Sequence, residues 1–372
     1  MTLRSLNPVS RREYLCTELG VSLPAIERAL ADTEDSVRIE NLVGAVSIPL
    51  GVAGPVQIHG ESVSGKRFVP LATTEGALVA SVNRGCKAIT DSGGVFTASD
   101  DTGMTRGPVF VTASLADSRK LEAWLARNEN LIREAAESTS AHLSYVSMQV
   151  RALARSVYVR FVFRTGQAMG MNMVTLATQK IVELVEDKTN ARCVAVAGNY
   201  DIDKKPAWLN VIENRGKRVR AEAVIHSTVI SSVLKTSASA INETWVEKCV
   251  QGSYLAGSLG FNCQFANIVA AVFAATGQDL AHVVEGSAGI TTVQVLEGGD
   301  LYCAVYLPAV LTATVGGGTK YKTQQEAHAI LGNPDASGLA EIIGAAVLAG
   351  ELSLLASLSV HTLARSHREL GR

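Results

Sequence analysis

The sequence lacks any marked imbalance of charge. Its 372 residues contain 34 Lys and Arg against 35 Asp and Glu, so the formal net charge is −1. A chain this close to neutral creates no long-range field that would attract nucleic acid or an anionic membrane surface. We therefore expect neither as a partner, and any anionic ligand has to be bound by local cations.

Cysteine is scarce, and no two cysteines form a C-x-x-C pair. The first 20 residues carry Arg11, Arg12, Glu13 and Glu18 where a secretory signal would have an apolar core. Both features are typical of free thiols in a reducing compartment, so they predict a cytoplasmic protein.

Long uninterrupted apolar runs are also missing. The longest apolar stretch, residues 342–360, is interrupted by Glu351 and is rich in glycine and alanine. A membrane span needs about 20 predominantly apolar residues, whereas a helix that is apolar on all sides can also be buried inside a protein. We predict a buried core helix here, and the second apolar run, residues 266–276, is too short to span a membrane.

Familiar ligand-binding signatures are absent. No G-x-G-x-x-G follows a strand pattern, and no histidine spacing is typical of a metal site, so we expect no metal. Residues 60–67 approach a phosphate-binding P-loop, but Arg67 stands where a Ser or Thr would hold Mg²⁺. Strand-like runs at 56–59 and 68–72 flank this segment, which is therefore predicted to be a hairpin turn.

The pattern of apolar residues predicts an α+β fold with three parts. Residues 1–39 have helical spacing and are expected to form a short helical N-terminal segment. A small α+β domain is expected over residues 108–197, inserted into a large mixed α/β domain formed by residues 40–107 and 208–372. Residues 198–207 form a polar connecting loop between two regular elements, and such loops often carry function.

Periodicity also predicts the individual elements. In the small domain these are a helix at 115–133, strands at 147–154 and 157–164, a helix at 171–187 and a strand at 192–197. In the large domain they are strands near 218–225, 291–296 and 301–307, and helices near 77–89, 227–250, 264–276, 323–331 and 337–366.

Four polar residues are candidates for chemistry. Glu75 lies at a strand-to-helix junction, where it either interacts with the helix dipole or, if burial raises its pKa, acts as a general acid. Asp279 ends an apolar helix and is a candidate neighbour for Glu75. Lys204 and Lys205 precede a proline; they are either solvated surface charges or cations that neutralise an oxyanion or a carboxylate.

Two glycine clusters are candidates for nucleotide binding. One is residues 169–173 at the start of a helix, and the other is residues 314–319 after a strand. Either would let the backbone approach a pyrophosphate at a helix N-terminus, and either is also explained by ordinary turn glycines.

Taken in order, these segments resemble one family, 3-hydroxy-3-methylglutaryl-coenzyme A (HMG-CoA) reductase. The resemblance runs from residue 40 to 368 and is carried by ENLVGAVSIPLGVAGP (40–55), TTEGALVASVNRGCKAI (73–89), GMTRGP (103–108), AMGMNM (168–173), GNYDIDKKPAWLNVIENRGK (198–217), GQD (277–279) and TVGGGT (314–319). The AMGMNM and DKKPA forms resemble class I of the family.

The resemblance implies an NADPH-dependent oxidoreductase of the mevalonate pathway. It would convert HMG-CoA into mevalonate and coenzyme A in two hydride transfers. The resemblance also implies a homodimer or a dimer of dimers with the active site at the interface, where residues 40–44 resemble a dimer-forming motif. An Arg that grips the 2′-phosphate in animal enzymes is replaced by Ala141, and an Asp by Gln167, so NADH is an alternative cofactor.

The resemblance further implies roles for individual residues. Lys204 would neutralise the oxyanion and Asp279 would position it. Glu75 would protonate the aldehyde oxygen, and His367 would protonate the departing thiolate. Positions that match substrate contacts are Arg106, Asp203 and Lys205 around the acyl carboxylate and Ser81, Asn83, Arg84 and Lys248 facing coenzyme A. Asn267, a further substrate-binding position, would complete the network of Glu75, Lys204 and Asp279. Positions that match nucleotide contacts are Met169, Gly170, Met171, Asn172, Gly316, Gly317, Gly318 and Thr319.

Two alternatives remain open. One is the class II form of the family, which often prefers NADH and runs in the degradative direction. The other is a coenzyme A-binding regulatory protein that has lost turnover. The intact set of Glu75, Lys204, Asp279 and His367 favours a catalyst.

Overall fold

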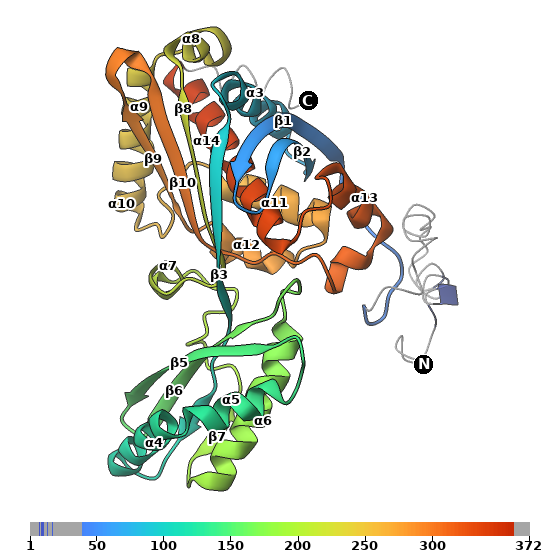
Figure 1. Cartoon of the computed structure of the whole chain (residues 1–372). Coiled ribbons are helices and arrows are strands. Elements are labelled where there is room, and N and C mark those ends of the chain that lie inside the picture. Colours follow the sequence, from blue (N-terminus) through green and yellow to red (C-terminus); the bar gives the residue numbers. More distant parts are fainter. Residues whose placement is uncertain (1–6, 8, 11–12, 14–16, 18–38, 361–372) are drawn as a thin grey trace.

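The computed structural model of the chain describes residues 7, 9, 10, 13, 17 and 39–360. The helical segment predicted over residues 1–39 therefore lies largely outside the described residues, as does the end of the helix predicted to reach residue 366. The described part is a mixed α/β fold around a mostly antiparallel sheet, which confirms the predicted mixture of helix and sheet. Figure 1 shows a larger upper part and a smaller lower part.

Strand β3 (Val95–Arg106) runs through both parts and joins them. In the large part it pairs antiparallel with β8 (Gly216–Ile225), and its last three residues pair antiparallel with β6 (Ser156–Arg164) in the small part. The strand order along the sheet is β7–β4–β6–β3–β8–β10–β9. The remaining strands on this path are β4 (Val109–Val111), β7 (Arg192–Ala195), β9 (Ile290–Val295) and β10 (Leu301–Val310).

Two strands near the beginning of the described chain form a hairpin. β1 (Leu50–Gly60) pairs antiparallel with β2 (Ser64–Ala72), and β1 also pairs in parallel with β3. The backbone N–H of Gly60 donates to the carbonyl of Val63 across the turn. The segment that approaches a P-loop is therefore part of this hairpin, as predicted.

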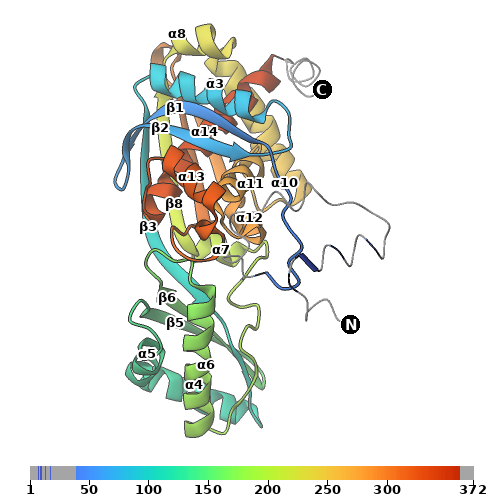
Figure 2. The same cartoon turned by 90° about the vertical axis from the view of Figure 1, so that its right-hand side faces the viewer.

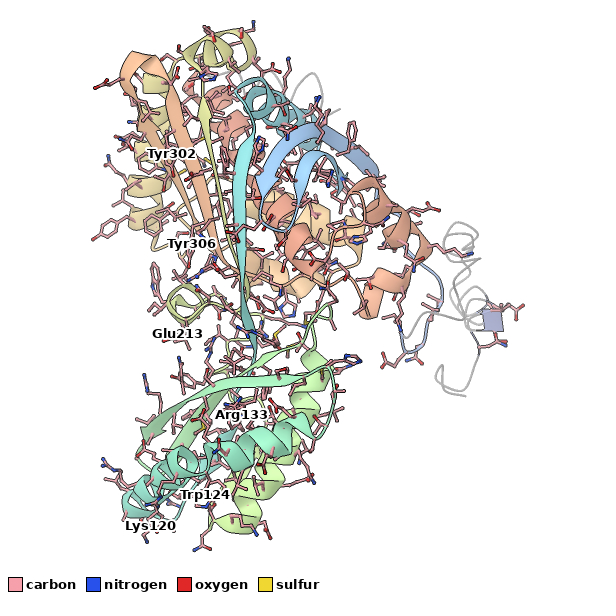
Figure 3. The ribbon with its side chains drawn as sticks, in the orientation of Figure 1. Lys120, Trp124, Arg133, Glu213, Tyr302 and Tyr306 are labelled. Atoms are coloured by element: carbon pink, nitrogen blue, oxygen red, sulfur yellow. The ribbon has the colours of Figure 1, made fainter. Side chains whose placement is uncertain are left out.

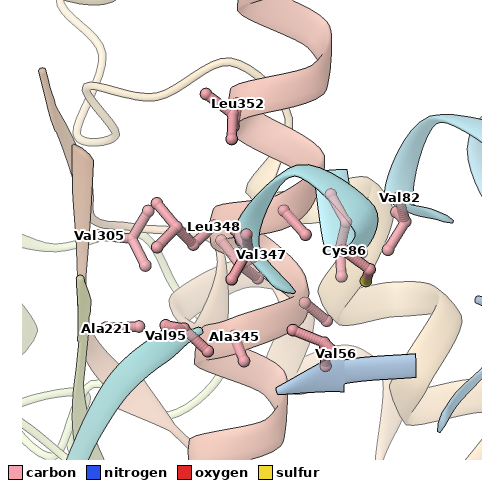
Figure 4. Packing of buried hydrophobic residues seen from close by; sticks show 14 of the residues in the cluster. Val56, Val82, Cys86, Val95, Ala221, Val305, Ala345, Val347, Leu348 and Leu352 are labelled. Carbon is pink, nitrogen blue, oxygen red and sulfur yellow. The ribbon is translucent and has the colours of Figure 1, made fainter. Parts of the chain in front are cut away.

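The large part is built around helix α14 (Ala336–Ser359). The helix is long and apolar enough to cross a membrane, but 83% of its most apolar window is buried inside the protein. It packs against α3 (Leu78–Asp91), α11 (Phe265–Thr276) and the sheet. The prediction of a buried core helix is confirmed. Figure 4 shows its residues Val347 and Leu348 packed among side chains of the sheet and of α3.

A carboxylate within the apolar helix α14 positions the neighbouring helix α11. Glu351 is fully buried and accepts hydrogen bonds from the backbone N–H groups of Cys263 and Gln264, which immediately precede α11. The free N–H groups at a helix N-terminus need such acceptors. The glutamate that interrupts the apolar run in the sequence thus fixes the start of α11, whose far end leads to Asp279.

The small part has a hydrophobic core of its own, formed by residues between Met104 and Ala191 together with Leu311. Its helices α4 (Leu115–Arg127), α5 (Glu129–Glu137) and α6 (Met171–Lys188) pack with β5 (Ser144–Leu153) and β6. Figure 2 shows α6 running along this lower part of the molecule.

Two predicted helices are interrupted. The helix predicted at 115–133 ends at Arg127, because the side chain of Asn128 donates to the carbonyl of Trp124 and the backbone leaves the helical conformation there. The helix predicted at 227–250 is broken at Lys235, which has a φ of 61°. It continues as α9 (Ala238–Trp245), capped by Ser237, and then as the π-helix Val246–Gly252.

Polar contacts join the two parts near the centre of the molecule. Gln149 of β5 donates to Glu213, which Figure 3 labels near the junction. The side-chain oxygen of Gln167 accepts hydrogen bonds from the hydroxyl of Thr314 and the N–H of Ala336. These hydrogen bonds, together with strand β3, connect the two parts.

Close packing of α3 on α14 gives a stability prediction. A Cβ added at Gly85 would overlap the carbonyl oxygen of Ala349 on α14. Alanine is a better helix former than glycine by about 1 kcal/mol, but an extra atom forced into a packed core typically costs about 1–3 kcal/mol. We therefore expect Gly85→Ala to lower the free energy of unfolding in denaturant titrations. Gly252→Ala, at an exposed position, is the control, and equal stabilities of the two variants would contradict this packing.

Candidate active site

The loop at residues 198–207 holds an unusual backbone conformation. Asn199, Ile202 and Lys204 all have positive φ angles of 63°, 51° and 57°. Each left-handed residue other than glycine costs about 1–2 kcal/mol, so the surrounding structure must hold the loop in place. It does so through the hydroxyl of Thr105, which donates to the carbonyl of Asp201, and through the Lys204 N–H, which donates to Glu285. Such strain clusters at functional sites.

This loop places the ammonium of Lys204 against the carboxylate of Asp279. The Nζ of Lys204 lies 2.8 Å from Oδ2 of Asp279, and both side chains are more than a third exposed. The other carboxylate oxygen of Asp279 accepts a hydrogen bond from the N–H of Ala281. The ion pair predicted from the sequence is therefore present and faces solvent, where a ligand can reach it.

Opposing effects act on the ionisation of Asp279. Partial burial raises the pKa of its carboxyl, but hydrogen bonds from the Lys204 ammonium and the Ala281 N–H, together with the field of His282, lower that pKa overall. Asp279 is therefore held as a carboxylate beside the ammonium.

A buried network of charges lies beneath this pair. The guanidinium of Arg215 is fully buried and bonds Glu285 at 2.6 Å and Asp203 at 3.0 Å. Glu285 also accepts from His282 Nδ1, at 2.9 Å. Arg106 contacts Asp203 at 3.7 Å on the other side of the network. Charge-assisted hydrogen bonds of this buried network thus hold the loop that carries Lys204 in place.

Arg106 has further partners in this network. Its Nε and one terminal nitrogen donate to the hydroxyl of Thr175 on α6, and its other terminal nitrogen donates to Asp201. A guanidinium has five N–H donors, so donors remain on both terminal nitrogens. Lys205 is exposed, and its ammonium donates to the carbonyl of Asp203.

The two glycine clusters line one cavity of about 840 Å³ together with Asp279. Residues 169–173 reach it from the N-terminus of α6, where Gly170 has a φ of 88°, and residues 316–319 line the same cavity. Gly277, with a φ of 72°, packs directly on Gly318, where a Cβ would overlap the backbone. Because this contact requires glycine, it fixes the TVGGGT segment next to Asp279.

Lys248 and Asn267 line a second cavity, of about 700 Å³, with Pro206 from the loop that carries Lys204. Lys248 lies in the π-helix Val246–Gly252, and such segments occur frequently at functional sites. Pro206 of the loop borders the second cavity, and Asp279, the partner of Lys204, borders the first.

The described chain does not bring Glu75 to the ion pair. Glu75 is exposed before α3, and no hydrogen bond or ion pair within residues 39–360 connects its side chain to Lys204 or Asp279. Within one chain α3 lies far from the junction of the two parts in both Figure 1 and Figure 2. The predicted convergence of Glu75 with Lys204, which was expected at a subunit interface, therefore stays a prediction. His367 lies outside the described residues.

Three further residues, which were predicted to face coenzyme A, lie on α3, shortly after Glu75 in the sequence. Arg84 donates to Ser353 and Ser357 of α14, and Ser81 donates to Ser353. Asn83 is exposed and accepts from the N–H of Gly54. Within one chain these residues attach α3 to its neighbours and lie apart from the Lys204 loop.

Sequence reasoning missed the members of the buried network. Arg215 lies in the quoted motif at 198–217 but was not predicted to have a role, and Glu285 and His282 follow the GQD motif. The sequence contains one feature that could have identified two of them: His282 and Glu285, three residues apart, interrupt a mostly apolar segment directly after Asp279. The ligand atoms of Asp203, His282 and Glu285 lie close together, but Arg215 already supplies their positive charge. The absence of a metal stays a prediction.

Comparisons with known proteins agree on one family. A family model described as hydroxymethylglutaryl-coenzyme A reductase matches residues 7–372. The chain is 48% identical over 368 residues to 3-hydroxy-3-methylglutaryl-coenzyme A reductase of Methanothermobacter thermautotrophicus, covering 97% of this chain and 92% of that protein. It is 42% identical over 347 residues to 3-hydroxy-3-methylglutaryl-coenzyme A reductase 2 of Dictyostelium discoideum, covering 90% of this chain and 65% of that protein.

A solved structure has the same fold. The class II 3-hydroxy-3-methylglutaryl-CoA reductase from Streptococcus pneumoniae, bound to NADPH in open conformations, is similar with a TM-score of 0.70. The match covers 94% of this chain and 96% of that chain, at 22% sequence identity. At this identity the similarity concerns the fold.

The lowered pKa of Asp279 gives a prediction for stability against pH. A carboxyl with a depressed pKa in the folded chain stabilises the fold above its unfolded pKa of about 3.9, and this contribution is lost as the pH falls through the folded pKa. We expect Asp279→Asn to melt below the wild type at neutral pH, and this gap to shrink below pH about 4.

The measurement is thermal unfolding of both proteins between neutral pH and about pH 3. Asp91→Asn, which removes an exposed ion pair with Lys87, is the matched control and should change little at any pH. A gap between Asp279→Asn and wild type that stays constant over the whole range would contradict the assignment.

Proposed function

The chain belongs to the hydroxymethylglutaryl-coenzyme A reductase family and is an oxidoreductase; from this premise we propose how its residues reduce (S)-HMG-CoA to mevalonate and coenzyme A. The observation that carries the proposal is the exposed Lys204–Asp279 ion pair, which stands beside a cavity lined by two glycine clusters.

Lys204 neutralises the negative charge that forms on the substrate oxygen. Hydride addition to the thioester carbonyl produces an oxyanion, and a fixed ammonium stabilises such a charge without reorganisation. Asp279 holds Lys204 in place through the 2.8 Å contact. When the carbon–sulfur bond breaks, an aldehyde forms, and the second hydride addition places charge on the same oxygen. One ammonium therefore serves both reduction steps.

The cavity beside this pair suits NADPH. Gly316 and Gly317 have open space where a side chain would stand, and Gly170 precedes the 18-residue helix α6. Such a helix N-terminus binds phosphate through free N–H groups. We propose that Met169, Gly170, Met171, Asn172 and Gly316–Thr319 hold the nucleotide. When bound, the nicotinamide supplies hydride, and Asp279 at the cavity wall marks the end where the reaction takes place.

The acyl carboxylate binds on the other side of Lys204. Arg106 has donors left on both terminal nitrogens, which is the geometry for a bidentate carboxylate contact. Lys205, Asp203 and, from the second cavity, Lys248 and Asn267 complete the proposed substrate contacts. The substrate thus lies across the loop, with its thioester directed toward the nucleotide.

We propose that a second copy of the chain completes the site. In one chain α3, which carries the proposed coenzyme A contacts Ser81, Asn83 and Arg84, lies away from the junction of the two parts (Figure 1 and Figure 2). Glu75 precedes this helix in the sequence. Val46 is 84% exposed in the segment after the predicted dimer motif, and Ile48, Leu50 and Val52 are each more than 40% exposed. An exposed apolar run suits a protein interface.

In the completed site, Glu75 protonates the aldehyde oxygen, and His367 protonates the departing thiolate, whose pKa is about 8.5 as for an ordinary thiol.

The finer assignments rest on the same residues. AMGMNM and DKKPA favour class I and synthesis of mevalonate over the degradative, NADH-preferring class II form.

We assign residues 40–107 and 208–372 to a substrate-binding domain, residues 108–197 to an NADP-binding domain and residues 198–207 to the connecting active-site loop, because two hydrophobic cores flank the cavity. The free thiols Cys86, Cys193, Cys249, Cys263 and Cys303 suit the cytoplasm.

Removal of the ammonium tests the proposed reaction. We expect Lys204→Ala to reduce the rate of HMG-CoA-dependent NADPH oxidation by at least about 10²–10³-fold, since the oxyanion loses its cation. Binding of coenzyme A, measured by calorimetry, should remain. Lys87→Ala removes an exposed lysine elsewhere and should leave the rate unchanged. Turnover of Lys204→Ala at the wild-type rate would refute the role of Lys204, and wild-type protein that binds coenzyme A without turnover would favour a regulatory protein.

Mixing two inactive variants tests the interface. If Glu75 and Lys204 of one site come from different chains, a heterodimer of Glu75→Gln and Lys204→Ala has one intact site. After denaturation and refolding of an equal mixture, half of the dimers are mixed, so about a quarter of wild-type NADPH oxidation should return. Each variant refolded alone is the control. No recovery from a mixture shown to contain heterodimers would contradict the shared site.

A further inference from the structure

His282 faces three carboxylates beneath the exposed ion pair. It is 1% exposed, its Nδ1 points to Glu285, with Asp203 Oδ1 at 3.9 Å, and its Nε2 points to Asp279. Nε2 is buried, has no hydrogen-bond partner among the described residues and lies 3.6 Å from Oδ2 of Asp279, the oxygen that also contacts the Lys204 ammonium. His282 is thus the direct link between the buried network and Asp279.

The hydrogen bonds of Glu285 settle which ring nitrogen donates. Its Oε1 accepts from the guanidinium of Arg215 and from the backbone N–H of Lys204. A carboxylate oxygen held by those donors offers only lone pairs, so Nδ1 of His282 must carry a proton to approach it at 2.9 Å. In a neutral ring Nε2 would then present a lone pair to the Asp279 carboxylate. Two facing lone pairs repel, whereas a proton on Nε2 makes this approach of 3.6 Å an electrostatic attraction, and the geometry favours the protonated ring.

The charge balance of the network favours the same conclusion. The charged groups connected by the described contacts are the cations Lys204, Arg106 and Arg215 and the carboxylates of Asp201, Asp203, Asp279 and Glu285. With a neutral His282 the carboxylates exceed the cations by one. Arg160 interacts electrostatically with Glu213 and, more weakly, with Arg215 and Asp201. Counted together with Glu213, Arg160 adds no net charge. Buried charge is costly unless paired.

We propose that His282 is a positioning residue for the reaction. It is held as an imidazolium whose positive charge attracts the Asp279 carboxylate from the buried side, while the Lys204 ammonium contacts the same carboxylate from the exposed side. This inference rests on the function proposed above. With its negative charge shared between two cations, Asp279 keeps Lys204 in place but leaves ammonium donors free for the substrate oxygen. The exposed ammonium of Lys205 remains on the solvent side, bonded to the carbonyl of Asp203.

Nitrogen NMR of the resting full-length chain tests the protonation directly. The probe is histidine labelled with ¹⁵N, and the His282 signals are identified by their loss in His282→Gln, or in His282→Asn should the first variant not fold. At pH about 7.5 an imidazole of ordinary pKa, about 6.5, is about nine-tenths neutral. We expect both ring nitrogens of His282 to have the shifts of protonated nitrogens at that pH. A lone-pair shift at either nitrogen would overturn the proposal.

Kinetics test the positioning role. Because misplacement of a catalytic group by about 1 Å can cost about 10²-fold, we expect His282→Leu to lower kcat by about that factor with little change in KM for HMG-CoA. His282→Gln keeps a donor toward Asp279 and should recover at least about tenfold of this loss. The matched control is His226→Gln, because His226 is an exposed histidine that also contacts an aspartate, Asp300; its kcat should equal that of the wild type.

The outcomes separate this inference from the proposed function. A wild-type kcat in His282→Leu would overturn the positioning role. So would equal losses in the Gln and Leu variants, because that result would indicate a purely structural role. If the wild-type chain fails to reduce HMG-CoA, the proposed function fails, and with it the link to catalysis. The NMR result still decides whether an imidazolium lies between Glu285 and Asp279.

Discussion

The structure of the site depends on one constraint: an exposed ammonium must stay in a fixed place on a strained loop. The 2.8 Å contact between Lys204 and Asp279 fixes the end of the side chain, and Glu285 fixes its backbone N–H. Glu285 is in turn held by the fully buried guanidinium of Arg215. Such buried charges persist only when each is paired, so the exposed pair and the buried network depend on each other.

The fold supplies the elements that meet around this loop. Strand β3 joins the two parts and ends at Arg106, while α11, whose start is fixed by Glu351, leads through Gly277 to Asp279. The contact of Gly277 with Gly318 places a glycine-rich segment at the same point, and the start of α6 lines the same cavity. A nucleotide and a thioester can therefore be brought together where the two hydrophobic cores adjoin.

Much of this arrangement could be predicted from the sequence, because periodicity and motifs are local. The β1–β2 hairpin, the buried helix α14 and the Lys204–Asp279 pair are as expected. The helix breaks at Asn128 and Lys235 depend on a side-chain hydrogen bond and a left-handed residue, which periodicity does not reveal. Arg215, His282 and Glu285 are distant from Lys204 in sequence, so only the tertiary fold identifies their contacts. The proposed place of Glu75 at the site depends on how two chains are arranged, which the sequence of one chain does not specify.

The most direct test of the central claim is a crystal structure of the chain with HMG-CoA bound. We predict that the thioester carbonyl oxygen lies within hydrogen-bond distance of the Lys204 ammonium, about 2.7–3.2 Å, while the contact with Asp279 is retained. A bound thioester whose carbonyl oxygen is beyond the reach of Lys204, or a Lys204 that has left Asp279, would contradict the account.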